Sequence, residues 1–462
     1  MNLDIREGVA GMRAWLGLTT VLLTVACTSG GPPAPVPFPV PSSSPVAGDL
    51  SDYRAGLEEA WSHIVAREGE TLPSSIADPT AATSIEIPSH PSIDGAVRYF
   101  STRLKESIQG SILRSSQYRT MIDGVLAEKK LPGAIAWLPV IESAYFPTLT
   151  SKAGARGVWQ FMPATAREYG LRVDWWIDER NDPEKSTRAA ATYLSDLHRM
   201  FGDWSLALAA YNCGPGRVRK TLEREGVTTF WELLERSALP KETRGYVPTF
   251  WATLLIVSDP AAHGFVMSDP VAIEKAKIDL EGPVTLDYVA RVAGVEPKVL
   301  QDFNPALHRG LVPPGRHSLS IPPAAKAPLL ASVNRMRFDD PDLPVTLYRL
   351  SSSETVASLA RRLELDRKTV TEMNALRSDR LGAGTTLYLP TSTTRLSETL
   401  ARRRSQVPEV HIVEKGDTLY GIARRHGLTL AELRELNDLA EGRVIHPGER
   451  LQVGQGTVAT GQ

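Results

Sequence analysis

Cysteine is nearly absent from this chain, and the little that is present cannot form a disulfide framework. The 462 residues include two cysteines, Cys27 and Cys213, whereas disulfide-stapled folds use several pairs. No excess of one charge occurs either, because 52 lysines and arginines are matched by 53 aspartates and glutamates. Without a basic block or a basic face, the chain lacks the surface through which proteins bind nucleic acid. We therefore expect no nucleic-acid partner.

Metal-ligand spacing is also missing. The nine histidines include no His-x-x-x-His pair or similar arrangement, and such spacings are typical of metal sites. We therefore expect no metal and no other cofactor. The apolar stretch near the N-terminus, residues 14–26, is too short for a membrane-spanning helix, which needs about 20 apolar residues.

That short stretch has the layout of a secretory signal peptide. Arg13 precedes it and Cys27 closes it, and a start at Met12 would leave a more basic N-terminal region. The ending Leu-Thr-Val-Ala-Cys resembles the lipobox of bacterial lipoproteins, which implies a lipid anchor on Cys27. Thr28, rather than aspartate, follows the cysteine, and in a Gram-negative host this implies the periplasmic face of the outer membrane. The alternative is an ordinary signal peptide in which Cys27 has no role.

The chain then passes through regions of different character. Proline and serine dominate residues 30–48, which favours an extended spacer. Residues 51–130 have weak helical periodicity, with Val97, Phe100, Leu104 and Ile108 at spacings of three and four. We can assign no chemistry to them.

Helical signals are strong in residues 131–260. Asp182-Pro183 predicts a helix start and Gly202 its end, and a second helix should run from Asp203 to Gly214. The apolar face of the first of these helices is predicted to consist of Ala190, Tyr193, Leu194, Leu197, Met200 and Phe201. This region should be compact and all-helical.

Beyond residue 260 the chain repeats itself three times. In each copy a threonine is followed 19 residues later by an asparagine. The pairs are Thr285 and Asn304, Thr355 and Asn374, and Thr418 and Asn437. Each copy is predicted to form a strand, two short helices and a strand. The joints between the copies, residues 322–342 and 391–408, are interpreted as linkers.

These repeats resemble the LysM domain, which implies binding to glycans that contain N-acetylglucosamine, such as peptidoglycan. The third copy matches best, with Gly416-Asp417 before its threonine. The second copy lacks the glycine and has Glu354 in place of the aspartate, and the first lacks both. The LysM fold is expected in the first copy, but its sugar binding stays open. The threonine and asparagine could also simply cap helices.

Four short segments in the helical region carry the candidate chemistry. They are Ile141 to Ala144, Gly157 to Phe161, Ala210 to Gly214, and Glu242 to Val247. Glu142 is a carboxylate on an otherwise apolar segment. Burial would disfavour its charged form and make it a proton donor near neutral pH. A buried glutamate that only hydrogen bonds to the chain is the alternative.

In combination, these segments resemble the catalytic domain of soluble lytic transglycosylases, and more closely the membrane-bound lytic murein transglycosylase D family. The resemblance implies a mainly helical, lysozyme-like domain in which Glu142 is the sole catalytic carboxylate. The substrate-binding residues that it implies are Ser151, Gln160, Tyr211, Asn212 and Tyr246.

Three other residues near these segments receive no catalytic role. Cys213 occupies a variable position of its segment, and no histidine lies nearby to activate it, so we interpret it as a buried thiol. Asp174 and Asp178 lie outside the motifs and are interpreted as surface or capping residues.

The family's reaction cleaves the bond between N-acetylmuramic acid and N-acetylglucosamine and leaves a 1,6-anhydro end. This resemblance therefore implies glycan strands of peptidoglycan as the partner. Two alternatives stay open, a lysozyme that releases a reducing sugar and an inactive scaffold that binds peptidoglycan. Endo or exo action, peptide-stem preference and oligomeric state do not follow from the sequence.

The predicted fold is multidomain, with a mainly α lysozyme-like catalytic domain followed by small α+β modules of βααβ type. The expected divisions are a lipoprotein signal peptide at 1–27, a linker at 28–50, an N-terminal helical region at 51–130, the catalytic domain at 131–260, a degenerate LysM-like repeat at 275–323, a LysM-like repeat at 344–390 and a LysM domain at 409–454.

Overall fold

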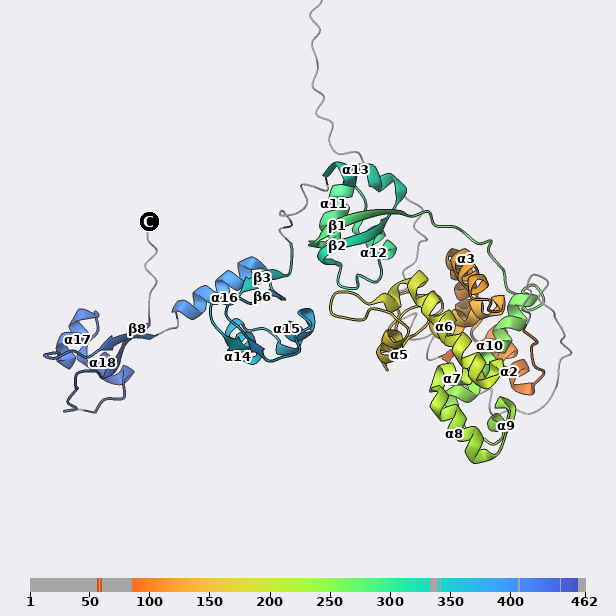
Figure 1. The fold of residues 1–462 in the computed structure, drawn as a ribbon, viewed down its shortest axis with the longest axis horizontal. Coiled ribbons are helices and arrows are strands. Elements are labelled where there is room, and N and C mark those ends of the chain that lie inside the picture. Colours follow the sequence, from red (N-terminus) through yellow and green to blue (C-terminus); the bar gives the residue numbers. More distant parts are fainter. Residues whose placement is uncertain are drawn as a thin grey trace, which may run out of the picture.

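The computed structural model describes residues 85–332, 342–405, 408–440 and 442–455, together with four single residues, Gly56, Leu57, Glu59 and Asp340. The predicted signal peptide, Cys27 and the proline-rich spacer lie outside the described residues. A helical body is followed by three small modules along the chain (Figure 1). Among the residues that are described, no helix is both long and apolar enough to cross a membrane.

The helical body, residues 91–265, has one hydrophobic core. Its helices are α2 (Pro91–Thr102), α3 (Lys105–Glu128), α4 (Leu138–Ser143), α5 (Pro163–Glu168), α6 (Pro183–Phe201), α7 (Trp204–Cys213), α8 (Pro215–Glu225), α9 (Phe230–Glu235) and α10 (Lys241–Ser258), with 3-10 turns η1 (Gly133–Trp137) and η2 (Glu179–Asn181). Val97, Phe100 and Ile108 of α2 and α3 are buried in the same core as Trp159 and Trp251. The division expected at residue 130 therefore does not coincide with a break in packing.

The predicted ends of α6 and α7 are confirmed. The Asp182 carboxylate accepts hydrogen bonds from the backbone N–H groups at the start of α6, and Gly202 ends this helix in a left-handed conformation with φ of 69°. Asp203 accepts from Leu206 N at 2.7 Å. The prediction for Met200 is wrong, because this side chain is 53% exposed. At 100° per residue it lies about 90° from the centre of the apolar stripe.

Each repeat has the predicted order of strand, two helices and strand. Module 1 (276–332) contains β1 (Ala276–Thr285), α11 (Leu286–Ala293), α12 (Pro297–Phe303), β2 (Leu311–Ile321), η3 (Pro323–Ala325) and α13 (Lys326–Ser332). Module 2 (346–405) contains β3 (Thr346–Arg349), β4 (Glu354–Thr355), α14 (Val356–Leu363), α15 (Arg367–Met373), β5 (Arg380–Leu381), β6 (Thr386–Leu389) and α16 (Thr393–Ser405). Module 3 (408–455) contains β7 (Pro408–Ile412), α17 (Leu419–Arg425), α18 (Leu430–Leu436) and β8 (Arg450–Gln455). The strand pairs β1–β2, β3–β6, β4–β5 and β7–β8 are antiparallel, and each module has its own apolar core.

The repeated threonine and asparagine have different structural tasks. Each threonine hydroxyl caps the first helix, as Thr418 does by accepting from Gly421 N at 3.0 Å. Each asparagine instead ties the second helix to the closing strand. In module 3, Asn437 Nδ2 donates to the backbone oxygens of Leu433 and Gln452 at 2.8 Å, and Asn437 Oδ1 accepts from Gln452 N at 2.6 Å. Asn304 and Asn374 make the same three bonds. The capping interpretation is therefore right for the threonine. It is incomplete for the asparagine, which stands at the C-cap of the second helix in modules 1 and 2 and also ties that helix to the closing strand.

The two joints interpreted as linkers are partly folded. The first contains α13, whose Leu329 is buried in the core of module 1. The second contains α16, whose Leu396 is buried in the core of module 2. In both cases a helix after the closing strand adds apolar side chains to the core of the preceding module. A search for the βααβ pattern alone does not detect this additional helix.

Asp417 gives module 3 an expected dependence on pH. Its carboxylate accepts from Glu414 N at 2.9 Å and His411 Nε2 at 2.7 Å, and it pairs with Arg425 at 3.2 Å. These contacts lower the pKa of Asp417 to about 2. Because the folded value lies below the ordinary value of about 4, the stabilisation is present above that pH and is lost as the pH falls towards 2.

We therefore expect the midpoint of thermal unfolding of module 3 to fall between about pH 5 and pH 2.5, and Asp417→Asn to remove much of this fall. The methyl NMR signals of Val453, which is buried in module 3, would report unfolding of this module within the full chain. Identical pH profiles for the wild type and Asp417→Asn would contradict the expectation.

Candidate active site

Glu142 lies at the end of the short helix α4, on a strained turn. Its neighbours Ile141 and Ser143 are buried, whereas Glu142 itself is partly exposed. Ala144 and Tyr145 follow with positive φ angles of 49° and 62°, a conformation that costs of order 1 kcal/mol or more per residue outside glycine. Other contacts hold the turn, including Arg114 Nε, which donates to Ala144 O at 2.8 Å.

The hydroxyl of Tyr246 donates a hydrogen bond to Glu142 Oε1. Tyr246 lies on α10, and its side chain is fully buried. Burial, and then the nearby charge of Glu142, raises the pKa of Tyr246 well above its ordinary value. The phenol therefore stays protonated and is a permanent donor that fixes one oxygen of the carboxyl group.

Gln160 is buried in the bend formed by residues 157–161. Its φ is 47°, and its amide nitrogen donates to Leu149 O at 3.1 Å and to Gly157 O at 2.9 Å. The bend is joined to α4, because Ser143 Oγ donates to Val158 O at 2.7 Å. The structure thus places Gln160 beside the segment that carries Glu142, with its amide nitrogen bonded inside the protein.

Tyr211 approaches the same bend from α7. Its hydroxyl donates to Trp159 O at 2.7 Å, and its ring centroid lies 5.3 Å from that of Tyr193 and 6.4 Å from that of Phe161. Burial raises the pKa of Tyr211 well above its ordinary value, and the charge of Glu142 adds to this effect. Tyr211 therefore shares the electrostatic environment of Glu142.

Asn212 joins the end of α7 to the start of α10. Its Oδ1 accepts from Thr243 Oγ1 at 2.7 Å, and its Nδ2 donates to Glu242 Oε1 at 3.2 Å. Sequence reasoning gave Glu242 and Thr243 no role of their own, although both lie in the fourth segment. Glu242 and Thr243 precede Tyr246 by four and three residues, so a helix places them on the same face as Tyr246. This spacing could have identified them as neighbours of the site.

Ser151 is less directly connected to this group. It is buried, its backbone N–H donates to Ala155 O at 2.8 Å, and its Oγ accepts from Ala155 N at 2.9 Å. It thus closes the turn of residues 151–155, in the loop that Gln160 holds at Leu149. Cys213, predicted to be buried, is half-buried, and burial raises the pKa of its thiol.

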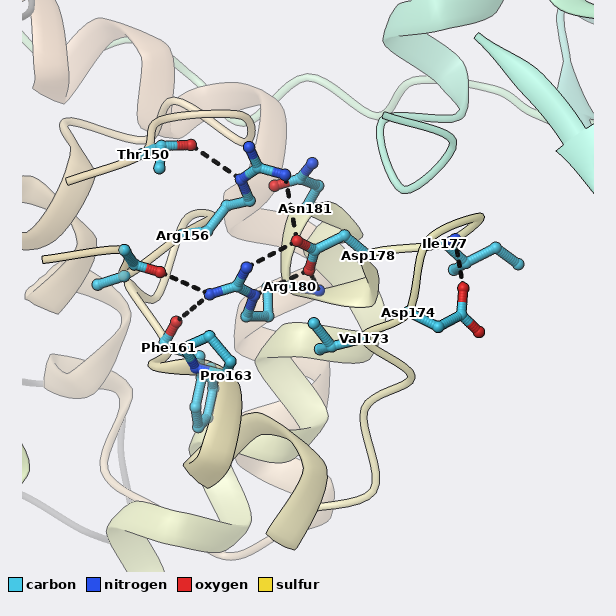
Figure 2. Close-up of polar contacts among 12 residues, drawn as sticks. Thr150, Arg156, Phe161, Pro163, Val173, Asp174, Ile177, Asp178, Arg180 and Asn181 are labelled. Carbon is cyan, nitrogen blue, oxygen red and sulfur yellow. Dashed lines mark hydrogen bonds and ion pairs between the residues drawn. The ribbon is translucent and has the colours of Figure 1, made fainter. Parts of the chain in front are cut away.

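An ion-pair network centred on the buried Asp178 and Arg180 contacts the bend of residues 157–161 (Figure 2). Arg180 donates through Nε and Nη2 to the two oxygens of Asp178 at 2.8 and 2.7 Å, and Arg156 pairs with the same carboxylate at 3.2 Å. Arg180 Nη1 also donates to Gly154 O at 2.8 Å and to Phe161 O at 3.0 Å. Burial alone raises the pKa of Asp178, but the bonds and charges of Arg180 and Arg156 outweigh it and hold the pKa below its ordinary value.

The interpretation of the two aspartates as surface or capping residues is confirmed for both, although Asp178 also has a buried role that was not predicted. Asp174 is exposed and its Oδ1 accepts from Trp176 N and Ile177 N at 2.8 Å, which caps a turn. Asp178 caps η2 by accepting from Arg180 N, but it is only 3% exposed. No spacing in the sequence reveals that two arginines from different loops converge on it.

Comparisons with known families agree with this architecture. Residues 123–234 match the transglycosylase SLT domain, residues 348–390 and 411–454 match the LysM domain, and residues 274–335 match the LysM-like domain of lytic transglycosylase MltD. The degenerate first repeat thus corresponds to a recognised LysM-like type. The combination of a helical SLT domain with LysM modules confirms the predicted fold class.

Two related proteins agree with the family matches. The soluble lytic murein transglycosylase of Salmonella typhimurium is 36% identical over 23% of this chain and 17% of its own length. The crystal structure of the 70 kDa soluble lytic transglycosylase of Escherichia coli is 26% identical, covering 35% of this chain and 27% of that chain with a TM-score of 0.29. Membrane-bound lytic murein transglycosylase D of Escherichia coli K12 is 31% identical over 367 residues, which cover 76% of this chain and 78% of the relative. The chain therefore belongs to the membrane-bound lytic murein transglycosylase D family.

Proposed function

We propose that this enzyme cleaves the β-1,4 bond between N-acetylmuramic acid and N-acetylglucosamine in peptidoglycan and leaves 1,6-anhydro ends. The observation that carries the proposal is the Glu142 carboxyl group, partly exposed and held at Oε1 by a buried, protonated tyrosine. Membership of the lytic transglycosylase family supports the substrate class.

A single carboxyl group can serve both halves of this reaction. Glu142 protonates the glycosidic oxygen as the bond to C1 breaks, and the substrate's acetamido oxygen stabilises the oxocarbenium-like centre, as in substrate-assisted glycosidases. The Glu142 carboxylate then takes the proton from the 6-hydroxyl, whose oxygen bonds to C1. The proton balance is closed and no water is consumed. General acid-base catalysis of this kind contributes roughly a hundred- to ten-thousand-fold.

The other predicted site residues divide into two proposed roles. Gln160, Ser151 and the hydroxyl of Tyr211 would shape the wall of the substrate groove, because their bonds are made to backbone groups of the loops at residues 149–161. Asn212 would fix the position of the first turn of α10, the helix that carries Tyr246. Tyr211 is a partly exposed residue, and its ring is the proposed surface for stacking a sugar.

Product analysis distinguishes this proposal from its alternatives. Purified sacculi digested with the enzyme should yield fragments whose muramic acid ends are 1,6-anhydro sugars by mass spectrometry. A lysozyme would give reducing ends heavier by one water, and an inactive scaffold would give no soluble fragments. Either of these outcomes would overturn the proposed reaction.

We further propose that Cys27 carries a lipid that anchors the enzyme to the periplasmic face of the outer membrane. A relative that is named membrane-bound supports a location in the cell envelope. Cys27→Ala should abolish incorporation of labelled palmitate and release the protein from the membrane fraction. Lipid attachment that persists in this variant, or unmodified wild-type protein found free in the periplasm, would contradict the anchor.

Module 3 is the proposed LysM domain that targets the enzyme to the wall. It matches the LysM family and has its own core, which supports independent folding of the residues before it. Deleting residues 410–462 should reduce retention on sacculi at least about tenfold, because a wall-binding module raises the effective concentration of the catalytic domain at its polymeric substrate. Turnover of short soluble glycan fragments should stay within about twofold of wild type. Unchanged retention would assign wall binding to another part of the chain.

A further inference from the structure

A loop of the helical body, residues 171–181, contacts the modules through two buried tryptophans. We call it the docking loop. Its two tryptophans, Trp175 and Trp176, belong to a separate apolar cluster with Leu311 of module 1 and Met373 of module 2. None of these residues belongs to the core of the helical body or of its own module. The cluster therefore exists only because the three parts meet.

Polar contacts fix module 1 against this loop. Asp178 N donates to Ala306 O at 2.9 Å, and Asn181 Nδ2 donates to Pro305 O at 3.1 Å. In the other direction, Arg309 of module 1 donates through Nε to Trp175 O at 2.9 Å. Its guanidinium carbon lies 4.4 Å from the centre of the Trp175 ring. Each partner thus contributes donors and acceptors, which gives the contact a defined orientation.

Module 2 meets the same loop through Trp176. The indole Nε1 donates to Met373 O at 2.9 Å, and the Trp176 ring packs edge-on against Tyr388 with centroids 5.8 Å apart. The side chain of Met373 is 4% exposed. Figure 1 shows the loop between α5 and α6 reaching the α15 end of module 2.

Modules 1 and 2 use the same edge for these contacts. Ala306 lies two residues after the repeated asparagine, and Met373 lies directly before it. In module 3 the position equivalent to Met373 is Leu436, which is 38% exposed, and Val444 in the loop that follows is 67% exposed. The edge that is covered in two modules is therefore open in the third.

We propose that modules 1 and 2 are intramolecular docking modules, held on the helical body by the docking loop, so that module 3 alone offers this edge to wall glycan. The part that concerns glycan rests on the proposed function. The backbone N–H of Asp178 donates to Ala306 O, and its carboxylate binds Arg180, which in turn donates to Gly154 O and Phe161 O. Figure 2 shows the part of this chain of contacts from Asp178 through Arg180 to Phe161. The docked module 1 therefore also supports the bend that contains Gln160.

Hydrogen exchange of the full-length protein tests the docking without reference to catalysis. Met373→Arg places a charge in the contact, and its matched control is Leu436→Arg at the equivalent, exposed position of module 3. We expect backbone amides of residues 171–178 to exchange at least about tenfold faster in Met373→Arg and to be unchanged in Leu436→Arg. Slow exchange in β6 would show that module 2 is still folded.

Trp176→Ala removes the same contact by a change in the helical body. Module 2 keeps its own sequence in this variant, so faster exchange in Trp176→Ala cannot result from unfolding of module 2 by Met373→Arg. Wild-type exchange of residues 171–178 in both variants would overturn the docking proposal. Retention on sacculi tests the open edge, and it should fall in Leu436→Arg and persist in Met373→Arg. Equal losses in these two variants would refute the assignment of the open edge to module 3. If the wild type itself were not retained, the proposed wall binding would fail while the exchange result stood.

Discussion

Glu142→Gln should abolish cleavage of peptidoglycan while the protein still binds to sacculi. Glutamine keeps the size of the side chain and can still accept the hydrogen bond from Tyr246, but it cannot deliver and recover a proton. The loss of rate should be at least about a hundredfold, the lower range for a general acid-base group. Release of soluble fragments from labelled sacculi measures it, and pull-down with unlabelled sacculi measures binding.

Glu128→Gln is a suitable control for this experiment. Glu128 is exposed and pairs with Arg188 on the surface, and such pairs contribute little to stability. This variant should retain wild-type cleavage. If Glu142→Gln kept more than about a tenth of the wild-type rate, Glu142 could not be the general acid, and a different carboxyl group would have to be sought.

Gly157→Ala should destabilise the helical body far more than Gly154→Ala. Both glycines have a φ close to 90°, so both variants incur the conformational cost of about 1 kcal/mol for a residue with a side chain. They differ in space. A Cβ at Gly157 would lie 1.8 Å from Arg180 O, whereas nothing lies within 4 Å of a Cβ at Gly154.

The clash at Gly157 cannot be relieved by a flexible side chain, because the obstacle is backbone that the bonds of Asp178 and Arg180 hold in place. We expect Gly157→Ala to lower the free energy of unfolding by at least about 3 kcal/mol and Gly154→Ala by about 1 kcal/mol. Tryptophan fluorescence measures unfolding of the helical body, because the three modules contain no tryptophan and none occurs after Trp251. Equal losses of unfolding free energy in the two variants would contradict this expectation, because they would mean that the backbone at Arg180 can move away at little cost.

Local signals in the sequence were sufficient for the helix ends and the repeats. Asp182 caps α6 through its carboxylate and Gly202 ends it through its left-handed backbone, and the 19-residue spacing reflects a helix pair of fixed length in every module. Glu142 could be singled out because a carboxylate on an apolar segment is unusual. Several of the predicted substrate-binding residues bond to neighbouring segments around Glu142.

Features that depend on contacts between distant segments could not be predicted. The left-handed conformations of Ala144, Tyr145 and Gln160 are set by bonds such as that from Arg114, which lies 30 residues away. The burial of Asp178 depends on two arginines and on module 1. Trp175 and Trp176 belong to an apolar cluster, but nothing in their neighbourhood along the chain indicates that the cluster is completed by modules more than 100 residues later.

The packing of α2 against α10 sets a lower limit on the length of an autonomous catalytic fragment. The match to the SLT domain begins at residue 123, near the end of α3, and a fragment cut there would lose α2 entirely. The helix that positions Tyr246 would then expose to water the apolar surface that Ile93, Ala96 and Phe100 now help to bury. A soluble, active fragment should therefore begin before Pro91, so the functional unit extends more than 30 residues beyond the N-terminal end of the SLT match.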